Sequence, residues 1–139
     1  MPRAQTLAGL LLELPTRPVV ALAIDDEDTR AMYAYAIVAA GFDVMTDDRA
    51  LTVDDSRFAA RPDILVADVS PGSSHGWRFV QKLKRERGTS DIPVIVVAAD
   101  AGAATCERAR REGCAAVCPK NCPANVLASG IQAVLSRVR

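Results

Sequence analysis

The chain has 139 residues, half of them hydrophobic, with 17 basic and 17 acidic side chains and a formal net charge of zero. This length is typical of one domain, and folding buries about two-thirds of the surface of such a chain. The hydrophobic fraction excludes a disordered tail, and the balanced charge argues against a general nucleic-acid binder. No apolar run reaches the roughly 20 residues of a membrane span, so we expect a cytoplasmic protein without a membrane partner. Its four cysteines are then expected to be reduced thiols.

Residues 1–17 are expected to form a leader and residues 18–139 the domain. The leucine-rich segment 7–14 predicts a short helix or arm, because it is short and lacks the small-residue cleavage pattern of a signal peptide. The Pro-Thr-Arg-Pro run at 15–18 marks the boundary. We expect the leader either to cover a hydrophobic patch or to mediate a homodimer.

Five short apolar runs alternate with five helical segments along the domain. The strands are predicted at 19–24, 42–46, 64–69, 94–98 and 115–118, and the helices at 28–40, 51–60, 77–86, 103–112 and 123–138. In the first of these helices Met32, Tyr35, Ala36 and Ala39 recur near helical spacing, and Gly41 follows as a C-cap. Parallel strands joined by right-handed helical crossovers are the expected result. The fold class is therefore α/β, a doubly wound five-stranded parallel sheet with five helices.

Charged side chains follow three of the predicted strands, at the edge where ligands bind in doubly wound sheets. Asp25 and Asp26 come directly after the first strand, Asp68 lies near the end of the third, and Lys120 follows the fifth. Clustered carboxylates repel one another, and a hard cation such as Mg²⁺ relieves that repulsion. Lys120, the one cation expected here, supplies a point charge for an anionic oxygen. The set suits phosphoryl transfer to a carboxylate.

The acids at 25–28 also have a simpler interpretation, because acidic residues are favoured as caps at the start of a helix. That alternative stays open for Asp25 and Asp26. Asp68 is harder to explain in this way, since it lies within the apolar run 64–69. Buried acids are rare unless they are paired or bind a metal.

The segment 19–138 resembles the receiver domain of two-component response regulators. The resemblance rests on four motifs, Ala23-Ile24-Asp25-Asp26-Glu27, Asp68-Val69-Ser70-Pro71-Gly72 with Gly76, Ile92-Pro93-Val94-Ile95-Val96-Val97-Ala98, and Pro119-Lys120. It implies a flavodoxin-like receiver fold in which Asp68 is the phosphoacceptor. The ligands of Mg²⁺ would be Asp25, Asp26, Asp68 and the backbone carbonyl of Ser70. Lys120 would contact the phosphoryl group, donated by a histidine kinase or a phosphotransfer protein.

Three positions depart from the family pattern. Ala98 stands where the family has a serine or threonine that binds the phosphoryl oxygen, which removes one charge-assisted hydrogen bond worth about 1.5–3 kcal/mol. Val117 replaces the aromatic switch residue, and Asn121 replaces the proline that usually follows the lysine. A two-state switch needs contacts that differ between its states. We therefore expect the phosphorylation chemistry to be intact and its relay to partners to be altered.

Two hypotheses for the function follow from these residues. The leading one is a stand-alone phosphorylatable receiver, which is expected to act through a downstream protein partner because the sequence ends with its last helix. The alternative is a pseudo-receiver, an interaction or scaffold module that works without phosphorylation. A metal-dependent phosphatase would need a second acid soon after the nucleophile, and Asp68-Val69-Ser70 supplies none. We therefore expect no dedicated enzyme, only a phosphoacceptor that catalyses its own phosphoryl transfer.

Other conspicuous residues have ordinary structural interpretations. The spacing of the cysteines does not match the Cys-x-x-Cys pairs of zinc sites, so we expect small-residue packing. His75 is expected to be an exposed loop residue near the site, and Trp77 a packing residue at a helix start. The basic runs at 82–87 and 108–111 are expected to be solvated helix faces or docking surfaces. The cysteines are Cys106, Cys114, Cys118 and Cys122.

Overall fold

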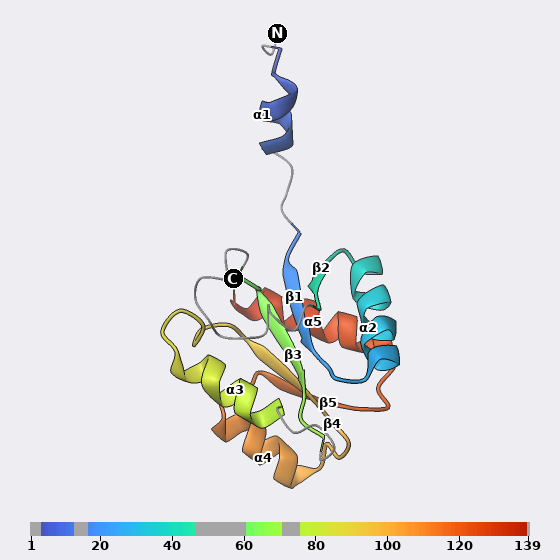
Figure 1. The fold of residues 1–139 in the computed structure, drawn as a ribbon, viewed down its shortest axis with the longest axis vertical. Coiled ribbons are helices and arrows are strands. Elements are labelled where there is room, and N and C mark those ends of the chain that lie inside the picture. The colour runs from blue at the N-terminus through green and yellow to red at the C-terminus, as the bar shows by residue number, and fades with distance from the viewer. Residues whose placement is uncertain (1–3, 13–16, 47–60, 71–75, 139) are drawn as a thin grey trace.

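The computed structural model of the protein describes residues 4–12, 17–46, 61–70 and 76–138. Within them lies a sheet with the strand order β2-β1-β3-β4-β5, in which every pairing is parallel (Figure 1). This order and the helical crossovers confirm the predicted doubly wound fold. The strands are β1 (Val19–Ala23), β2 (Asp43–Met45), β3 (Ile64–Asp68), β4 (Val94–Ala98) and β5 (Ala116–Pro119). The helices are α1 (Leu7–Leu12), α2 (Glu27–Ala39), α3 (Gly76–Arg85), α4 (Ala103–Arg111) and α5 (Ala124–Val138).

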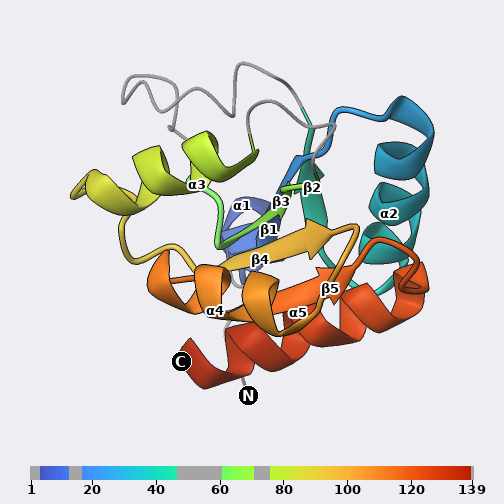
Figure 2. The ribbon, with the colours of Figure 1, turned by 90° about the horizontal axis from the view of Figure 1, so that it is seen from below.

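Helices cover both faces of the sheet. Helices α2 and α5 lie on one face and helices α3 and α4 on the other (Figure 2). Their side chains contribute to two separate hydrophobic cores, one on each face. Every residue of β3 and β4 is buried, because alternate side chains point into the two separate cores. This explains why the central strands read as uninterrupted apolar runs rather than as an alternating pattern. Asp68 thus ends a strand that is covered by helices on both faces of the sheet.

The ends of α2 and α4 are set by glycines. Gly41 has φ of 105° and Gly113 has φ of 82°, both in the left-handed region that an L side chain rarely adopts. After α2, the Gly41 amide donates to the Val38 carbonyl at 3.1 Å and the Phe42 amide to the Ile37 carbonyl at 3.2 Å. This pair of bonds is a Schellman motif, and Phe42 and Ile37 are both buried in the same core. The sequence prediction that Gly41 terminates this helix is confirmed.

The buried face of α2 differs from the residues singled out in the sequence. Met32 is 52% exposed and Tyr35 is 81% exposed, whereas Tyr33 and Ile37 are completely buried. The helix is rich in alanine, so its apolar residues are spread around the axis and their spacing does not define one face. The side of α2 that carries Tyr33 is buried because it packs against α5 and the sheet. The helix predicted at 51–60 lies outside the described residues, as do positions 13–14 of the leader segment.

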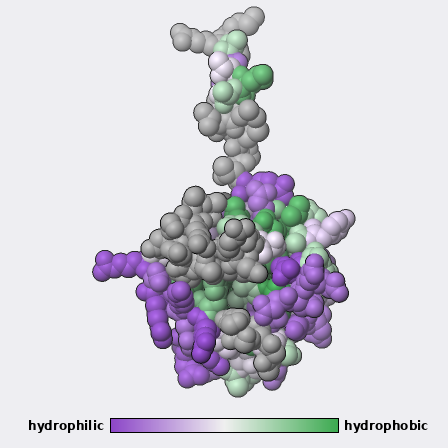
Figure 3. All heavy atoms as spheres, viewed as in Figure 1, coloured by the Kyte–Doolittle hydropathy of each residue, from purple (hydrophilic) through white to green (hydrophobic). Residues whose placement is uncertain are grey.

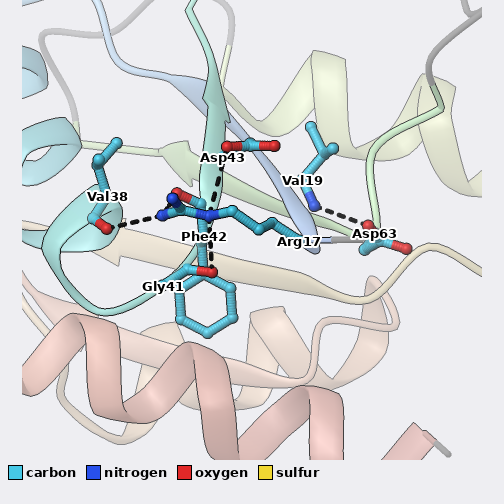
Figure 4. Close-up of polar contacts among 7 residues, drawn as sticks. All are labelled: Arg17, Val19, Val38, Gly41, Phe42, Asp43 and Asp63. Carbon is cyan, nitrogen blue, oxygen red and sulfur yellow. Dashed lines mark hydrogen bonds and ion pairs between the residues drawn. The ribbon is translucent and has the colours of Figure 1, made fainter. Parts of the chain in front are cut away.

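Arg17 fixes the start of the domain to the end of α2. Its guanidinium donates to the carbonyl oxygens of Gly41 at 3.1 Å, Val38 at 2.9 Å and Phe42 at 2.9 Å (Figure 4). The Val38 carbonyl belongs to the last turn of α2 and the other two lie just beyond it, at the end of the helix where the partial negative charge favours a cation. Arg17, expected to be the last leader residue, is therefore held by the domain through its side chain.

The helices expose polar side chains together with some large hydrophobic ones, such as Met32 and Val38 on α2. Figure 3 shows polar side chains gathered over the α3 side of the molecule and over the α2 side. Helix α1 stands apart from the sheet in Figure 1, and its Leu7 and Leu10 are exposed. None of the described helices is long and apolar enough to cross a membrane.

One lysine of the predicted basic face on α3 has a structural role. The Lys84 ammonium donates to the carbonyl oxygens of Ser90 at 3.3 Å and Ile92 at 2.8 Å, which secures the connection to β4. Burial lowers its pKa below the usual lysine value. The prediction that this basic run is a solvated helix face or a docking surface does not hold at Lys84, because a long side chain can bury its stem and bring its charge to loop carbonyls.

Candidate functional site

Asp68 is a buried acid at the carboxyl end of a central strand. It is the last residue of β3, is 4% exposed, and lies in register with Val97 of β4. One carboxylate oxygen, Oδ1, accepts a hydrogen bond from the Ser70 amide at 2.9 Å. The other, Oδ2, lies 3.4 Å from the Lys120 ammonium. The structure thus brings together Asp68 and Lys120, two residues whose convergence the strand topology predicts.

The backbone of Lys120 is held by hydrogen bonds with two neighbouring elements, β4 and α2. The Lys120 amide donates to the Ala98 carbonyl at the end of β4, at 2.8 Å. The Lys120 carbonyl accepts a hydrogen bond from the Tyr33 hydroxyl at 3.3 Å. Burial, as the main cause, raises the pKa of Tyr33, so this hydroxyl remains a donor at neutral pH. Sequence reasoning missed Tyr33, since nothing local links a tyrosine on α2 to a loop 87 positions away.

Asp25 and Asp26 follow β1 after one buried residue, Ile24, and both are exposed. Asp26 is the N-cap of α2, and its Oδ2 accepts hydrogen bonds from the Thr29 amide at 2.8 Å and from the Thr29 hydroxyl. These bonds are the main reason why the pKa of Asp26 is lowered, and the charges of Lys120 and Arg30 act in the same direction. The capping interpretation left open by the sequence is therefore realised at Asp26.

Arg30 is a second cation at this edge of the sheet. Its guanidinium donates to the Ile24 carbonyl at 2.9 Å, and its charge helps to lower the pKa of Asp26. Lys120 is therefore not the only cation at this edge, and the prediction of a single local cation is incomplete. The signal that could have revealed Arg30 is its position four residues after Asp26, one turn into a helix that begins at the site.

The oxygen donors at this edge of the sheet determine whether a magnesium ion fits here. Among the residues that the structure describes, no three acidic, histidine or cysteine side chains are grouped to hold one metal ion. Mg²⁺ nevertheless takes only one or two protein carboxylates together with waters and phosphate oxygens, and the donors at these strand ends are oxygens of that kind. For Asp26 to ligate, its carboxylate would have to leave Thr29. Magnesium ligation by Asp25, Asp26, Asp68 and the Ser70 carbonyl stays a prediction.

Ala98 and Val117, the two positions at which an altered switch was predicted, lie on adjacent strands. Ala98 ends β4 and is 4% exposed, and it brings a methyl group to the site where a hydroxyl was expected from the family pattern. Val117 in β5 is partly buried against the core that α3 and α4 share. Beside Ala98 is a pocket of about 430 Å³, whose lining includes Ser70, Trp77 and Arg108. The Arg108 guanidinium lies over the Trp77 ring, 4.5 Å from its centroid. The first arginine of the basic run at 108–111, which was predicted to be a solvated face or a docking surface, therefore makes a cation–π contact.

Gly76 allows the backbone after Asp68 to pass close to α3. A Cβ atom at position 76 would lie 2.1 Å from the Asp68 carbonyl oxygen and 2.8 Å from the Val69 Cα. No side chain fits in that space unless the backbone moves. Gly76 thus determines how closely the first turn of α3 approaches the end of β3, and it helps to position Asp68.

The cysteines do not form a metal site among the described residues. Cys106 is exposed, whereas Cys118 is buried and lies within hydrogen-bond reach of Cys122. Burial is the main cause that raises the pKa of Cys118 to about 12 and that of Cys114 to about 11. Such thiols pack as small apolar groups, in line with the sequence expectation. His75, together with Pro71 and Gly72, lies outside the described residues.

Comparisons with known proteins identify the fold. No protein-family model and no curated protein matches this sequence. A response regulator from Thermotoga maritima has a TM-score of 0.72 at 16% identity, with 87% of this chain and 99% of that chain covered. The chemotaxis protein CheY4 of Vibrio cholerae has a TM-score of 0.74 at 20% identity, over 86% and 99%. The receiver domain of a histidine kinase from Syntrophus aciditrophicus has a TM-score of 0.70 at 21% identity, over 88% and 92%. The fold of this chain is that of response regulator receiver domains.

Proposed function

We propose that this chain is a receiver that accepts a phosphoryl group on Asp68 from a histidine kinase or a phosphotransfer protein. The observation that carries the proposal is the buried Asp68 carboxylate at the end of β3, with the Lys120 ammonium 3.4 Å from its Oδ2. A buried carboxylate at the ligand-binding edge of a parallel sheet, paired with one lysine, has the parts needed for nucleophilic attack on phosphorus. The receiver fold supports the same assignment.

The reaction forms one bond to phosphorus and breaks another. An Asp68 oxygen attacks the phosphoryl group of a phosphohistidine, the P–N bond breaks, and its electron pair returns to the imidazole. The Ser70 amide orients the carboxylate through Oδ1, and the Lys120 ammonium offsets the charge of the phosphoryl oxygens. Mg²⁺, when bound, neutralises charge on those oxygens. The residues proposed to hold it are Asp25, Asp26, Asp68 and the Ser70 carbonyl.

The proposed role is that of a signalling component rather than a dedicated enzyme. The chain promotes its own phosphorylation and passes the signal to a downstream protein, and we place it in the cytoplasm with its donor. Ala98 and Val117 lack the hydroxyl and the aromatic ring of the usual switch, so coupling to that partner is proposed to be weak or to use another route. An NMR titration with beryllofluoride tests this point. Shifts in α4 and β5 as large as those of an ordinary receiver would contradict it.

A second candidate function is a pseudo-receiver, a protein-interaction module that does not depend on phosphate. The observation that favours it is the Asp26 carboxylate, which caps α2 through Thr29. The buried methyl group of Ala98 favours it as well. A module of this kind would keep the fold and its binding faces without using Asp68 as a nucleophile.

Incubation with Mg²⁺ and acetyl phosphate, followed by intact-mass spectrometry, separates the two functions. The first predicts a gain of one phosphoryl group by the wild type, no gain by Asp68→Asn, and no gain when the metal is chelated. Asp91→Asn is the matched control, because Asp91 is an exposed acid that pairs with Arg61, and both precede the amino ends of β4 and β3, opposite to the carboxyl ends where Asp68 lies. No gain by a folded wild-type protein would favour the pseudo-receiver, and a gain that persists in Asp68→Asn would exclude Asp68 as the acceptor.

A further inference from the structure

The Ser70 hydroxyl is a buried polar group that has no described hydrogen-bond partner. Ser70 is 5% exposed, and within the described part of the chain no group bonds to its Oγ. Its backbone amide, in contrast, is used, since it donates to Oδ1 of Asp68 at 2.9 Å. A buried hydroxyl without a partner is destabilising, and groups of this kind are concentrated where a ligand or a catalytic step supplies the missing partner.

Ser70 lies beside the position where the expected hydroxyl is absent. The Val69 amide donates to the Val97 carbonyl at 2.8 Å, so the chain leaving β3 runs along the end of β4. Ser70 and Ala98 line the same pocket of about 430 Å³. Ala98 contributes only a methyl group there. The segment after β3 therefore brings a residue that carries a hydroxyl, Ser70, next to the end of β4, where Ala98 has none.

We propose that the Ser70 hydroxyl donates a hydrogen bond to the phosphoryl group on Asp68, in place of the hydroxyl that Ala98 lacks. The inference rests on the proposed function, because it requires a phosphoryl group at Asp68. During transfer the Asp68 oxygen forms the new P–O bond, the donor's P–N bond breaks, and Ser70 keeps its proton. The phosphoryl oxygens then have two donors from different elements, the Lys120 ammonium and the Ser70 hydroxyl.

Binding of beryllofluoride in the presence of Mg²⁺ tests this role. Trp77 is the single tryptophan of the chain and lines the same pocket, so its fluorescence reports occupancy. We expect Ser70→Ala to weaken beryllofluoride binding by about 10- to 100-fold, the loss expected for one charge-assisted hydrogen bond. Ala98→Ser placed in the Ser70→Ala background should restore most of the affinity. Ser129→Ala is the matched control, since the Ser129 hydroxyl donates to the Asn125 carbonyl on α5 and lies on another element.

A second readout needs no ligand. Because the hydroxyl has no partner among the described residues, Ser70→Ala should raise the melting temperature by a few degrees while it weakens anion binding. A structural role would instead make the same variant less stable. Should Ser70→Ala fail to fold, Ser70→Cys keeps a similar volume with a weaker donor, and the same loss of affinity is expected.

The outcomes separate this inference from the function on which it rests. A wild-type protein that takes up neither a phosphoryl group from acetyl phosphate nor beryllofluoride overturns the proposed function, and the inference with it. Equal affinities of wild type and Ser70→Ala overturn the inference alone and leave Asp68 as the acceptor. A lower melting temperature of free Ser70→Ala would likewise assign Ser70 a structural role.

Discussion

Replacement of Gly76 by alanine should disturb the site through the backbone alone. The added Cβ would lie 2.1 Å from the Asp68 carbonyl oxygen, so the two elements must separate by about 0.9 Å before the contact reaches 3.0 Å. The atoms in contact belong to the backbone of Asp68 and Val69, which cannot rotate away as a flexible side chain can. Overpacking of this kind costs about 1–3 kcal/mol. For a chain of this size that is a fall in melting temperature of roughly 4–12 °C.

The assay is thermal or urea unfolding followed by circular dichroism. Gly130→Ala is the matched control, because a Cβ there meets no atom within 4 Å and replaces a glycine inside α5. That variant should be more stable than the wild type by about 0.5–1 kcal/mol. We also expect Gly76→Ala, when folded, to accept less phosphoryl group from acetyl phosphate, since Asp68 is displaced. A Gly76→Ala protein as stable as the wild type would refute the reasoning from close packing.

Three further predictions concern single side chains. Tyr33→Phe removes the hydrogen bond to the Lys120 carbonyl and should cost about 0.5–1.5 kcal/mol in urea unfolding, and an unchanged midpoint would show that this bond contributes nothing. Because the pKa of Asp26 is lowered, its contribution to stability is present above the ordinary aspartate pKa of 3.8 and is lost as the pH falls through the lowered value. Melting temperatures measured from neutral to acidic pH should therefore depend less on acid in Asp26→Asn, which keeps a good N-cap, and equal pH dependence would contradict this assignment. Cys106 should react with iodoacetamide at pH 8 about 100-fold faster than Cys118, whose pKa is raised to about 12, and comparable rates in the folded protein would show that Cys118 is not shielded.

Most of the architecture was predictable because its signals are local. β4 is a buried run bounded by Pro93 and a loop, and it begins and ends where the sequence predicts. Gly41 terminates α2 because its positive φ is a requirement of the backbone, independent of what packs around it. The buried face of α2 was not predictable in the same way. Tyr33 rather than Tyr35 faces the core because α5 packs there, and an alanine-rich helix carries no pattern that records this contact.

The candidate site likewise has features that the sequence predicts and features that depend on the folded chain. The proximity of Asp68 and Lys120 follows from parallel strands whose carboxyl ends share one edge, so sequence order was enough to predict it. The role of Asp26 was not decided by sequence, because a cap and a metal ligand require the same carboxylate at the same position. The choice depends on Thr29, whose amide and hydroxyl both reach Asp26 once the helix has formed. The sequence also could not predict that the Ser70 hydroxyl is buried without a hydrogen-bond partner among the described residues, because burial is a property of the folded chain.

The central claim is that Asp68 carries the phosphoryl group, and chemical trapping of the acyl phosphate tests it most directly. Borohydride reduces an aspartyl phosphate to homoserine, so the protein treated with Mg²⁺ and acetyl phosphate is reduced, digested and mapped by tandem mass spectrometry. We predict homoserine at position 68 and at no other acidic residue. Homoserine at another aspartate, or none in a protein that has gained a phosphoryl group, would contradict the assignment.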